Sequence, residues 1–340
     1  MKRAAAGRVS NALRARKSWR TLLHRFGFAF IIGAAPALGL AQTSAGWAPT
    51  KPIKLVVPYP PGGGSDIAAR VMVNALGNRL GQPIVIENKP GANGAVGTEI
   101  VFNAAPDGYT LIMSGTDAYS RYPALYPNAK FVSAQFVPVA PTAIVNFVLM
   151  GRPGLPAKNL PELLALAKKR QLSFSSWGNG SAGHVAMAQF NLVAKTEMLH
   201  VPYQGAAPAA QAVVGGQVDL TLMPVLLAHS FKDRLIPFGI VAPERLELIK
   251  DIPTLIEQGT NVSAPSWVGV LAPPKTPAAV VATLAKAMIE TMSDPAIDKK
   301  LNEAGLAPLH GSTQEFAVLI AKDFDFWGKA IRDADIKVDQ

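Results

Sequence analysis

Short apolar runs alternate with amphipathic runs along the chain from residue 53 onwards, and this alternation restricts the folds that it can adopt. Short apolar runs predict strands, and runs with apolar residues every three or four positions predict helices. Strands that alternate with helices build parallel sheets covered by helices, so the sequence predicts an α/β fold. The predicted strands are 53–57, 84–86, 110–113, 146–150, 172–175, 199–202, 219–223, 238–242 and 268–272. The predicted helices are 66–80, 94–104, 161–170, 184–195, 206–215, 277–292, 295–304 and 313–331.

Two of the predicted helices begin with a capping signal. Asn159 with Glu162, and Ser312 with Glu315, have the spacing of a capping box, in which each side chain accepts a hydrogen bond from the other residue's backbone N–H. These pairs fix where the helices at 161–170 and 313–331 begin.

A glycine turn, Tyr59–Asp66 (YPPGGGSD), connects the first predicted strand to the first predicted helix. A helix start leaves backbone N–H groups unpaired, and the helix dipole adds partial positive charge there. Glycine has no Cβ, so the backbone can approach a ligand closely. The turn lacks the Lys-Ser/Thr of a P-loop and the G-x-G-x-x-G order of a dinucleotide site. It predicts a site for a small anion; the alternative is a tight connection in which Asp66 serves only the helix N-terminus.

Two later loops, Gly178–His184 (GNGSAGH) and Pro202–Gly205 (PYQG), also follow a predicted strand and open a predicted helix. In α/β sheets ligands bind outside the carboxyl ends of the strands. If these loops face the glycine turn across a cleft, they form a two-sided pocket. None of 58–66, 178–184 and 202–206 contains Lys or Arg, so backbone and hydroxyl donors would hold the anion.

The first 41 residues have the pattern of a cleaved signal peptide. The first 25 residues carry eight basic residues and no acidic one, and an apolar run, Phe26–Leu40, follows. Small residues at Gly39 and Ala41 fit the −3 and −1 positions of a cleavage site. The run is too short and too interrupted by Pro36 for a typical membrane span, so an uncleaved anchor is the weaker alternative.

Export changes the meaning of the charge. The whole chain has 33 basic and 23 acidic residues, a net charge of +10, but removal of the leader's eight basic residues leaves 25 against 23, or +2. A nearly neutral mature chain gives no indication of nucleic-acid binding. The absence of cysteine excludes disulfides, thiolate metal sites and cysteine nucleophiles, and the histidines show no metal-ligand spacing. The remaining chain of roughly 295 residues is long enough for two domains.

Several motifs in order resemble those of the Bug, or TctC-like, periplasmic receptors of tripartite tricarboxylate transporters. They are Pro58–Arg70 (PYPPGGGSDIAAR), Glu87–Glu99 (ENKPGANGAVGTE), Pro106–Met113 (PDGYTLIM), Phe136–Val139 (FVPV), Gly178–His184 (GNGSAGH), His200–Asp219 (HVPYQGAAPAAQAVVGGQVD), Asp251–Gly259 (DIPTLIEQG) and Trp267–Pro277. The resemblance covers nearly all of the chain after the leader. It implies a type II, two-domain Venus-flytrap fold, each domain a mostly parallel sheet flanked by helices.

The resemblance also implies the division of the chain and its ligand. The expected domains are 48–143 plus 268–340, and 144–267, with a small carboxylate bound between them. No catalytic residue, metal or cofactor is expected; the expected partners are membrane transporter subunits or a sensor kinase, with no nucleic acid and a monomeric protein in the periplasm. The predicted ligand-binding residues are Tyr59, Pro61, Gly62, Gly63, Gly64, Ser65, Asp66, Thr116, Asp117, Gly180, Ser181, Ala182, His184, Tyr203, Gly205 and Ala206.

The chain departs from the family pattern at several positions, and the usual ligand contacts are expected to differ there. Gly183 stands where the family has a hydroxyl residue, and Asp117 lies in a segment with a different family pattern. Asp117 would repel an anionic ligand end and attract a donor, or it is a solvated or capping residue. His184 is either a ligand group or a structural hydrogen-bonding residue. The remaining departures are Tyr119, Tyr122 and Met223-Pro224.

The sequence therefore predicts an exported solute receptor that captures a small carboxylate between two lobes. One alternative is an exported enzyme that acts on an organic acid in the same cleft. It would need a nucleophile beside a base, and neither Ser65 nor Ser181 lies in a G-x-S-x-G motif. A second alternative is a signalling module without a ligand.

Overall fold

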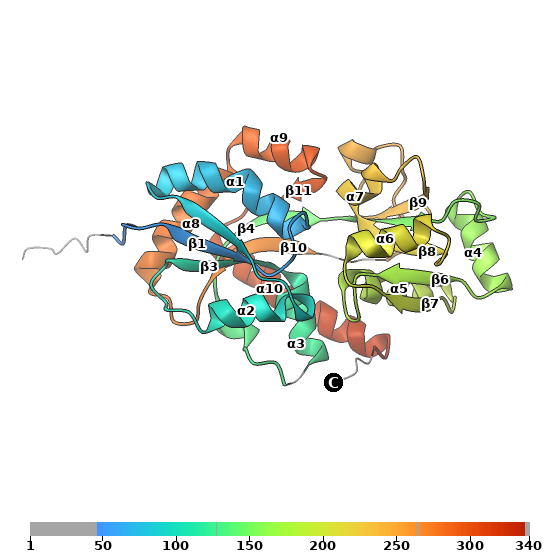
Figure 1. The fold of residues 1–340 in the computed structure, drawn as a ribbon, viewed down its shortest axis with the longest axis horizontal. Helices are drawn as coiled ribbons and strands as arrows, with labels where there is room; N and C mark the ends of the chain where they lie inside the picture. Colours follow the sequence, from blue (N-terminus) through green and yellow to red (C-terminus); the bar gives the residue numbers. More distant parts are fainter. Residues whose placement is uncertain (1–45, 127, 263, 265, 337–340) are drawn as a thin grey trace, which may run out of the picture. The chain divides into compact units, whose positions relative to one another are not determined.

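Residues 46–336, except 127, 263 and 265, are described by a computed structural model (Figure 1). The predicted signal peptide, 1–41, lies outside the described residues. The strands are β1 Ile53–Val57, β2 Ile84–Asn88, β3 Thr110–Gly115, β4 Val137–Val145, β5 Phe147–Gly151, β6 Ser173–Ser176, β7 Leu199–Pro202, β8 Leu220–Pro224, β9 Ile236–Val241, β10 Trp267–Ala272 and β11 Leu306–Pro308. The helices are α1 Gly64–Leu80, α2 Ala95–Phe102, α3 Tyr122–Leu125, α4 Leu160–Lys169, α5 Ala182–Ala194, α6 Ala206–Val214, α7 Val225–Ser230, α8 Ala278–Met292, α9 Pro295–Glu303 and α10 Thr313–Asp333, with a π-helical turn, η2, at Asp117–Arg121.

The strands form two sheets, and the α/β prediction is confirmed. The first sheet has the order β11-β4-β10-β3-β1-β2, and the second has the order β7-β6-β8-β5-β9. Parallel pairing is confined to one half of each sheet: β2, β1 and β3 in the first, and β7, β6 and β8 in the second. The other pairs are antiparallel. The sheets are mixed. The chain passes from β4 to β5 and from β9 to β10 into the other sheet, without the crossover helix that joins parallel neighbours in one sheet.

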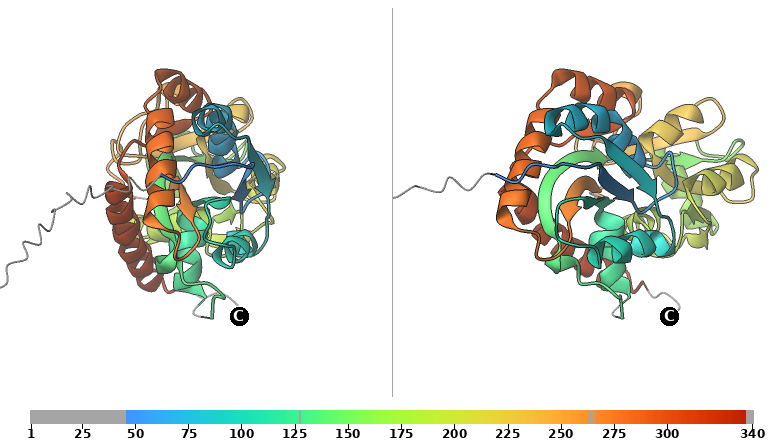
Figure 2. Two further views of the ribbon diagram at one scale, coloured as in Figure 1. Left: turned by 90° about the vertical axis from the view of Figure 1, so that its left-hand side faces the viewer. Right: turned by 60° about the vertical axis from the view of Figure 1, so that its left-hand side comes forward.

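Helices cover both faces of each sheet because both faces of the strands are apolar. In β1, Leu55 and Val57 pack in the core cluster that contains Met72 of α1 and Leu284 of α8. Val56 points to the other face, into the cluster with α2 and α10. Figure 2 shows helices on both sides of this sheet. The second sheet repeats the pattern, with α4 and α5 packed in one cluster and α6 and α7 in another. Such continuously buried strands are typical of sheets with two covered faces.

The chain passes between the sheets at two neighbouring points. β4 of the first sheet and β5 of the second are separated by Asn146 alone, and the return runs from Val241 at the end of β9 to Trp267 at the start of β10. The two passages are joined, because the N–H of Val145 donates to the carbonyl of Ser266 at 2.7 Å.

The helix-start predictions hold to different degrees. Ser312 and Glu315 form the predicted capping box at α10. At α4, Asn159 accepts the N–H of Glu162, but the Glu162 carboxylate accepts the N–H of Lys158 instead of that of Asn159, so only half of the box forms. None of the helices in the part of the chain that the structure describes combines the length and apolar character that a membrane crossing needs.

A cluster of charged residues around Asp219 lies at the edge of the second sheet where β6 and β8 begin. The carboxylate accepts hydrogen bonds from Arg152 at 3.0 Å, from Arg170 at 3.0 Å and from the N–H of Ser173 at 3.1 Å. Burial alone would raise the pKa of Asp219, but the bonds from Arg170, Arg152 and Ser173 outweigh it and lower that pKa. The carboxylate thereby connects the start of β8 to the start of β6, to the end of α4 and to the segment that follows β5.

Replacement of Asp219 by Asn is expected to lower the free energy of unfolding by about 2–3 kcal/mol, because several charge-assisted bonds lose their acceptor charge. Urea denaturation followed by circular dichroism measures it. The matched control is Asp325→Asn, since Asp325 is exposed and makes no hydrogen bond or ion pair among the described residues. A loss at Asp219 no larger than that at Asp325 would contradict the stabilising role.

Candidate functional site

The carboxyl ends of the parallel strands bring the predicted loops together within each sheet. In the first sheet, the ends of β1, β2 and β3 lead into 58–63, 89–94 and Thr116. In the second, the ends of β6 and β7 lead into 177–181 and 203–205. Each set of loops thus occupies one edge of its sheet, where α/β proteins bind ligands.

The glycine turn is held by Asp66, which is only 2% exposed. Its carboxylate accepts the N–H of Gly62 at 2.9 Å, two bonds from Arg70 at 2.8 and 3.0 Å, and one from Asn88 at 2.9 Å. Burial tends to raise the pKa of Asp66, but these bonds outweigh it and lower that pKa. Gly62 has φ +85°, which glycine adopts without strain. Through these bonds the Asp66 side chain holds the turn in place just before α1.

The first turn of α1 has unpaired backbone N–H groups, although the Asp66 side chain holds the turn before it. Gly63 is the N-cap and offers no side chain, and the N–H groups of Gly64, Ser65 and Asp66 have no acceptor among the described residues. Pro61 and Gly62 are exposed. The turn thus presents unpaired N–H groups at the positive end of a 17-residue helix, the arrangement that favours an anion.

Two predicted site residues of this sheet bond within the protein. The hydroxyl of Tyr59 accepts the N–H of Ala118 at 3.1 Å, and burial raises the pKa of Tyr59 above its ordinary range. Thr116 is fully buried, and its hydroxyl accepts the N–H of Trp267 at 3.2 Å. Both side chains fix the segment that follows β3.

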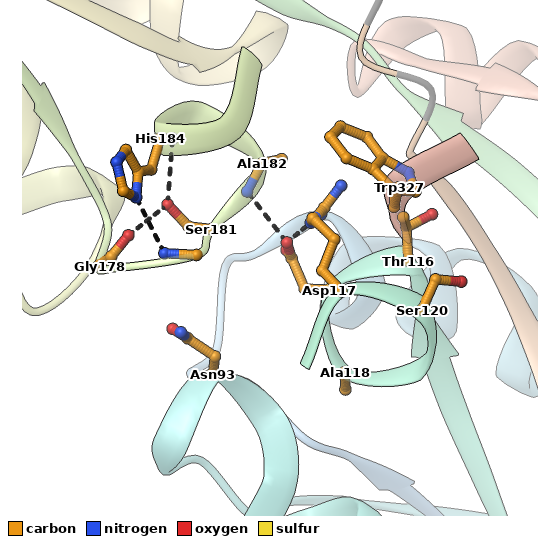
Figure 3. A network of polar contacts seen from close by, with 12 residues as sticks. Asn93, Thr116, Asp117, Ala118, Ser120, Gly178, Ser181, Ala182, His184 and Trp327 are labelled. Atoms are coloured by element: carbon orange, nitrogen blue, oxygen red, sulfur yellow. Dashed lines mark hydrogen bonds and ion pairs between the residues drawn. The ribbon is translucent and has the colours of Figure 1, made fainter. Parts of the chain in front are cut away.

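The loop before α5 is closed by its own side chains. Ser181 is the N-cap: its hydroxyl donates to the carbonyl of Gly178 at 2.7 Å and accepts the N–H of His184 at 3.4 Å. Nδ1 of His184 accepts the N–H of Gly180 at 3.1 Å (Figure 3). His184 thus acts as a structural hydrogen-bonding residue, with the N–H of Gly180 as its partner.

His184 stacks on His200, with ring centroids 3.7 Å apart and planes at 9°. Nε2 of His200 lies 2.7 Å from the hydroxyl of Ser176. Burial lowers the pKa of His184 to about 4, and burial together with the neighbouring His184 lowers the pKa of His200 to about 3. Two neutral, stacked rings thus support the loop, since a proton on either would be poorly solvated.

The two sheets meet through side chains of the first and backbone of the second. The Asp117 carboxylate accepts the N–H of Ala182 at 3.1 Å (Figure 3). Asn93, in the left-handed region at φ 52°, donates to the carbonyl of Asn179 at 2.7 Å. No hydrogen bond among the described residues joins the glycine turn directly to 178–184. Instead, η2 lies between them, bonded to Tyr59 on one side and to Ala182 on the other.

A groove of about 370 Å³ opens beside these contacts. It is lined by Ala92, Asn93, Tyr122, Tyr126, Trp177, Gly178, Asn179, Pro202, Tyr203 and Gln204. Aromatic and amide side chains dominate it, and none of its lining residues is charged. Of the predicted site residues, Tyr203 lines this groove. Gly205 is the N-cap of α6 and Ala206 is its first residue, and neither lines the groove.

The departure at Gly183 has a steric cause. A Cβ at this position would lie 2.7 Å from the ring of Trp177, closer than such atoms approach. Trp177 in turn stacks on Phe147, with centroids 5.4 Å apart. Glycine at 183 therefore leaves room for the tryptophan that lines the groove. The departure at Tyr119 belongs to the core, where its ring packs edge-on against Trp267.

Two residues of this region were not among the predicted site residues. Arg121 is the buried ion-pair partner of Asp117, and Asn93 bridges to the second sheet. Asp117 and Arg121 have the i,i+4 spacing of an ion pair on a helix, but the sequence predicts no helix at 117–121, so the spacing alone does not identify the pair. No group of His, Cys, Asp and Glu in the described ranges is arranged to hold a metal ion.

The lowered histidine pKa values predict an acid-sensitive fold. His184 and His200 bind protons near pH 6.5 in the unfolded state but only at about pH 4 and about pH 3 in the folded state. Their contribution to the free energy of unfolding is therefore fully present above pH 6.5 and is lost as the pH falls towards the folded pKa values. Asp323, whose pKa burial raises to about 6, works in the opposite direction, so variants must be compared. His200→Gln should reduce the loss of unfolding free energy between pH 7 and 5 by about 1–2 kcal/mol. Urea titrations measure this; His229→Gln is the control, and equal losses in all three proteins would contradict it.

Comparison with known proteins agrees with this architecture. The sequence model of the tripartite tricarboxylate transporter family receptor, TctC, matches residues 68–336. Protein BugT of Bordetella pertussis is 31% identical over 305 residues, which cover 88% of this chain and 94% of BugT.

Two solved structures with bound ligands superpose on the fold. MatC of Rhodopseudomonas palustris with bound malate has a TM-score of 0.75 at 29% identity, covering 83% of this chain and 99% of MatC. R. palustris Rpa4515 with adipate has a TM-score of 0.80 at 28% identity, covering 85% and 99%. The chain belongs to the tripartite tricarboxylate transporter family of receptors, the Bug or TctC-like proteins.

Proposed function

We propose that this chain is a receptor that captures a small organic carboxylate where the loop edges of its two sheets meet. The observation that carries the proposal is the meeting itself: Asp117 and Asn93 of one edge bond to Ala182 and Asn179 of the other. Loops from two sheets can enclose a ligand that neither holds alone. The malate and adipate bound to MatC and Rpa4515 support a carboxylate as the ligand class.

The first carboxylate site in this proposal is the glycine turn. The N–H groups of Gly64, Ser65 and Asp66 lack acceptors in the described residues, and they stand at the positive end of α1. No Lys or Arg is needed, because a helix N-terminus binds anions through its N–H groups and its dipole. Tyr203 and the other groove residues would contact the remainder of the ligand.

The two sheets are proposed as lobes that move about the passages between them. The lobes correspond to the expected domains, 48–143 plus 268–340, and 144–267, except that the end of β4 at Val145 and the start of β10 at Trp267 belong to the first sheet. Asn146 is the only residue between β4 and β5, and the bond from Val145 to Ser266 ties the two passages into one hinge region. A ligand that touches both edges would favour the closed arrangement.

We further propose that the leader at 1–41 exports the chain to the periplasm, where it acts as a monomer. It would deliver its ligand to membrane subunits of a tripartite tricarboxylate transporter or report the ligand to a sensor. The family supports this role. Binding without chemistry is the proposed activity. Ser65 and Ser181 have no base within hydrogen-bond reach among the described residues, and Ser176, whose hydroxyl lies 2.7 Å from Nε2 of His200, is 0% exposed and so out of reach of a ligand.

The proposal predicts stabilisation by organic acids. At about 100 times its dissociation constant, a carboxylate ligand should raise the free energy of unfolding by roughly 2.7 kcal/mol. A thermal-shift screen of mono-, di- and tricarboxylates, with sugars and cations as comparison sets, measures it. Shifts with sugars or cations and none with any acid would overturn the proposal.

The glycine turn can be tested separately through Gly63→Val. Gly63 has φ −77° and ψ 165°, and an added Cβ would approach nothing closer than the carbonyl of Pro60 at 3.6 Å, so valine fits without strain. Its branched side chain would obstruct the N–H groups of α1 and weaken ligand binding at least ten-fold, about 1.4 kcal/mol. Isothermal titration calorimetry measures the affinity. Gly46→Val, where a Cβ meets nothing within 4 Å, is the control, and equal affinities in the two variants would place the ligand elsewhere.

A further inference from the structure

Asp117 is attached to one sheet but bonded to the other. It is the first residue of η2, just beyond the carboxyl end of β3, and its carboxylate accepts the N–H of Ala182 at 3.1 Å. Ala182 is the first residue of α5, a helix of 13 residues. A carboxylate of the protein thus occupies the N-terminus of a helix that belongs to the opposite loop edge (Figure 3). This is the position that a helix offers to an external anion.

The charge of Asp117 is required by Arg121. The Arg121 side chain is 0% exposed, and one of its terminal nitrogens donates to the same carboxylate oxygen. Its Nε and Nη1 have no partner in the described part of the chain. The guanidinium lies over the ring of Trp327, 4.1 Å from its centroid. A buried cation without a counter-ion is costly, so Asp117 is held in place by Arg121 as well as by α5.

The other charged group near Arg121 is already engaged. Asp323 is buried on α10, and its carboxyl accepts hydrogen bonds from the hydroxyl of Ser120 and from the indole N–H of Trp327, the latter at 3.0 Å. Asp323 and Arg121 attract each other electrostatically, but no hydrogen bond or ion pair joins them among the described residues. Asp117 is therefore the residue whose carboxylate both completes the arginine and fills the end of α5.

We propose that Asp117 is a built-in carboxylate that fills the anion position at α5, so that this receptor selects ligands with a single carboxylate over dicarboxylates. The inference rests on the proposed function for the glycine turn, which remains the site for the ligand's own carboxylate. A second ligand carboxylate near α5 would find the N–H of Ala182 already bonded to Asp117. It would also lie beside the partly exposed Asp117 carboxylate, which Arg121 neutralises only from the buried side, and like charges at short range disfavour binding. The adjacent groove contains no cation to offset this, but its tyrosines, tryptophan and amides suit an uncharged, flat ligand body.

The first experiment compares matched acids on the wild-type protein by titration calorimetry: benzoate with terephthalate, and butyrate with succinate. At least ten-fold tighter binding of a monocarboxylate than of its partner is expected. Equal or tighter binding of the dicarboxylates would overturn the inference while leaving the proposed function intact.

The second experiment needs no natural ligand and therefore separates the two proposals. In Asp117→Ala, the N–H of Ala182 and the guanidinium of Arg121 lose their acceptor, and formate can enter the vacated space. The melting temperature of the variant should lie below that of the wild type and rise with sodium formate, relative to sodium chloride at equal ionic strength. The control is Asp107→Ala, in which an exposed carboxylate that accepts the N–H of Tyr109 is removed. A formate response equal to that of the wild type or of the control would overturn the inference.

A third variant keeps the test decisive if Asp117→Ala does not fold. Asp117→Asn retains an oxygen acceptor for Ala182 but loses the charge, so it should bind the dicarboxylates at least ten-fold more tightly than the wild type does. An unchanged ratio of monocarboxylate to dicarboxylate affinity would show that Asp117 takes no part in selection.

Discussion

The single residue between β4 and β5 determines how the rest of the molecule is arranged. A chain that leaves one sheet at Val145 and enters the other at Phe147 has no length for the sheets to separate, so any motion between them must be a hinge motion about that point. The return passage is bonded to it through Ser266. The loop edges of the two sheets therefore lie within hydrogen-bonding distance of each other, and contacts such as Asn93 to Asn179 become possible. The contacts between the two loop edges depend on this connection.

The sequence predicted the fold class and most of the elements because these depend on local patterns. The strands at 53–57 and 199–202 have the predicted bounds, and the other predicted strands and helices appear with shifted ends. β4 was missed, because its nine residues contain Pro138 and Pro141, which argue against a strand. α3 and η2 were missed as well, since Pro123 and aromatic residues obscure the helical period. The mixed direction of the strands could not be predicted, because it depends on connections that no local pattern reveals.

The site was only partly accessible from the sequence. The loops at strand ends could be identified, because a strand, a glycine-rich turn and a helix start follow one another in the chain. Their partners could not be identified, because they come from elsewhere: Ala118 for Tyr59, Trp267 for Thr116 and Ala182 for Asp117. These bonds give several predicted ligand residues an internal partner instead. Whether a polar side chain faces a ligand or its own protein is a matter of tertiary contacts, which local motifs do not contain.

The glycine at 183 affects the shape of the groove without lining it. Trp177 rests against the start of α5 only because no side chain stands at 183. A serine or alanine there would force the indole to move, and the groove would change shape although every lining residue stayed the same. Relatives with a hydroxyl residue at this position are expected to hold a different side chain, or a different rotamer, at the position of Trp177. The groove can therefore change shape through substitutions at positions that do not line it, and a comparison of the lining residues alone would not reveal them.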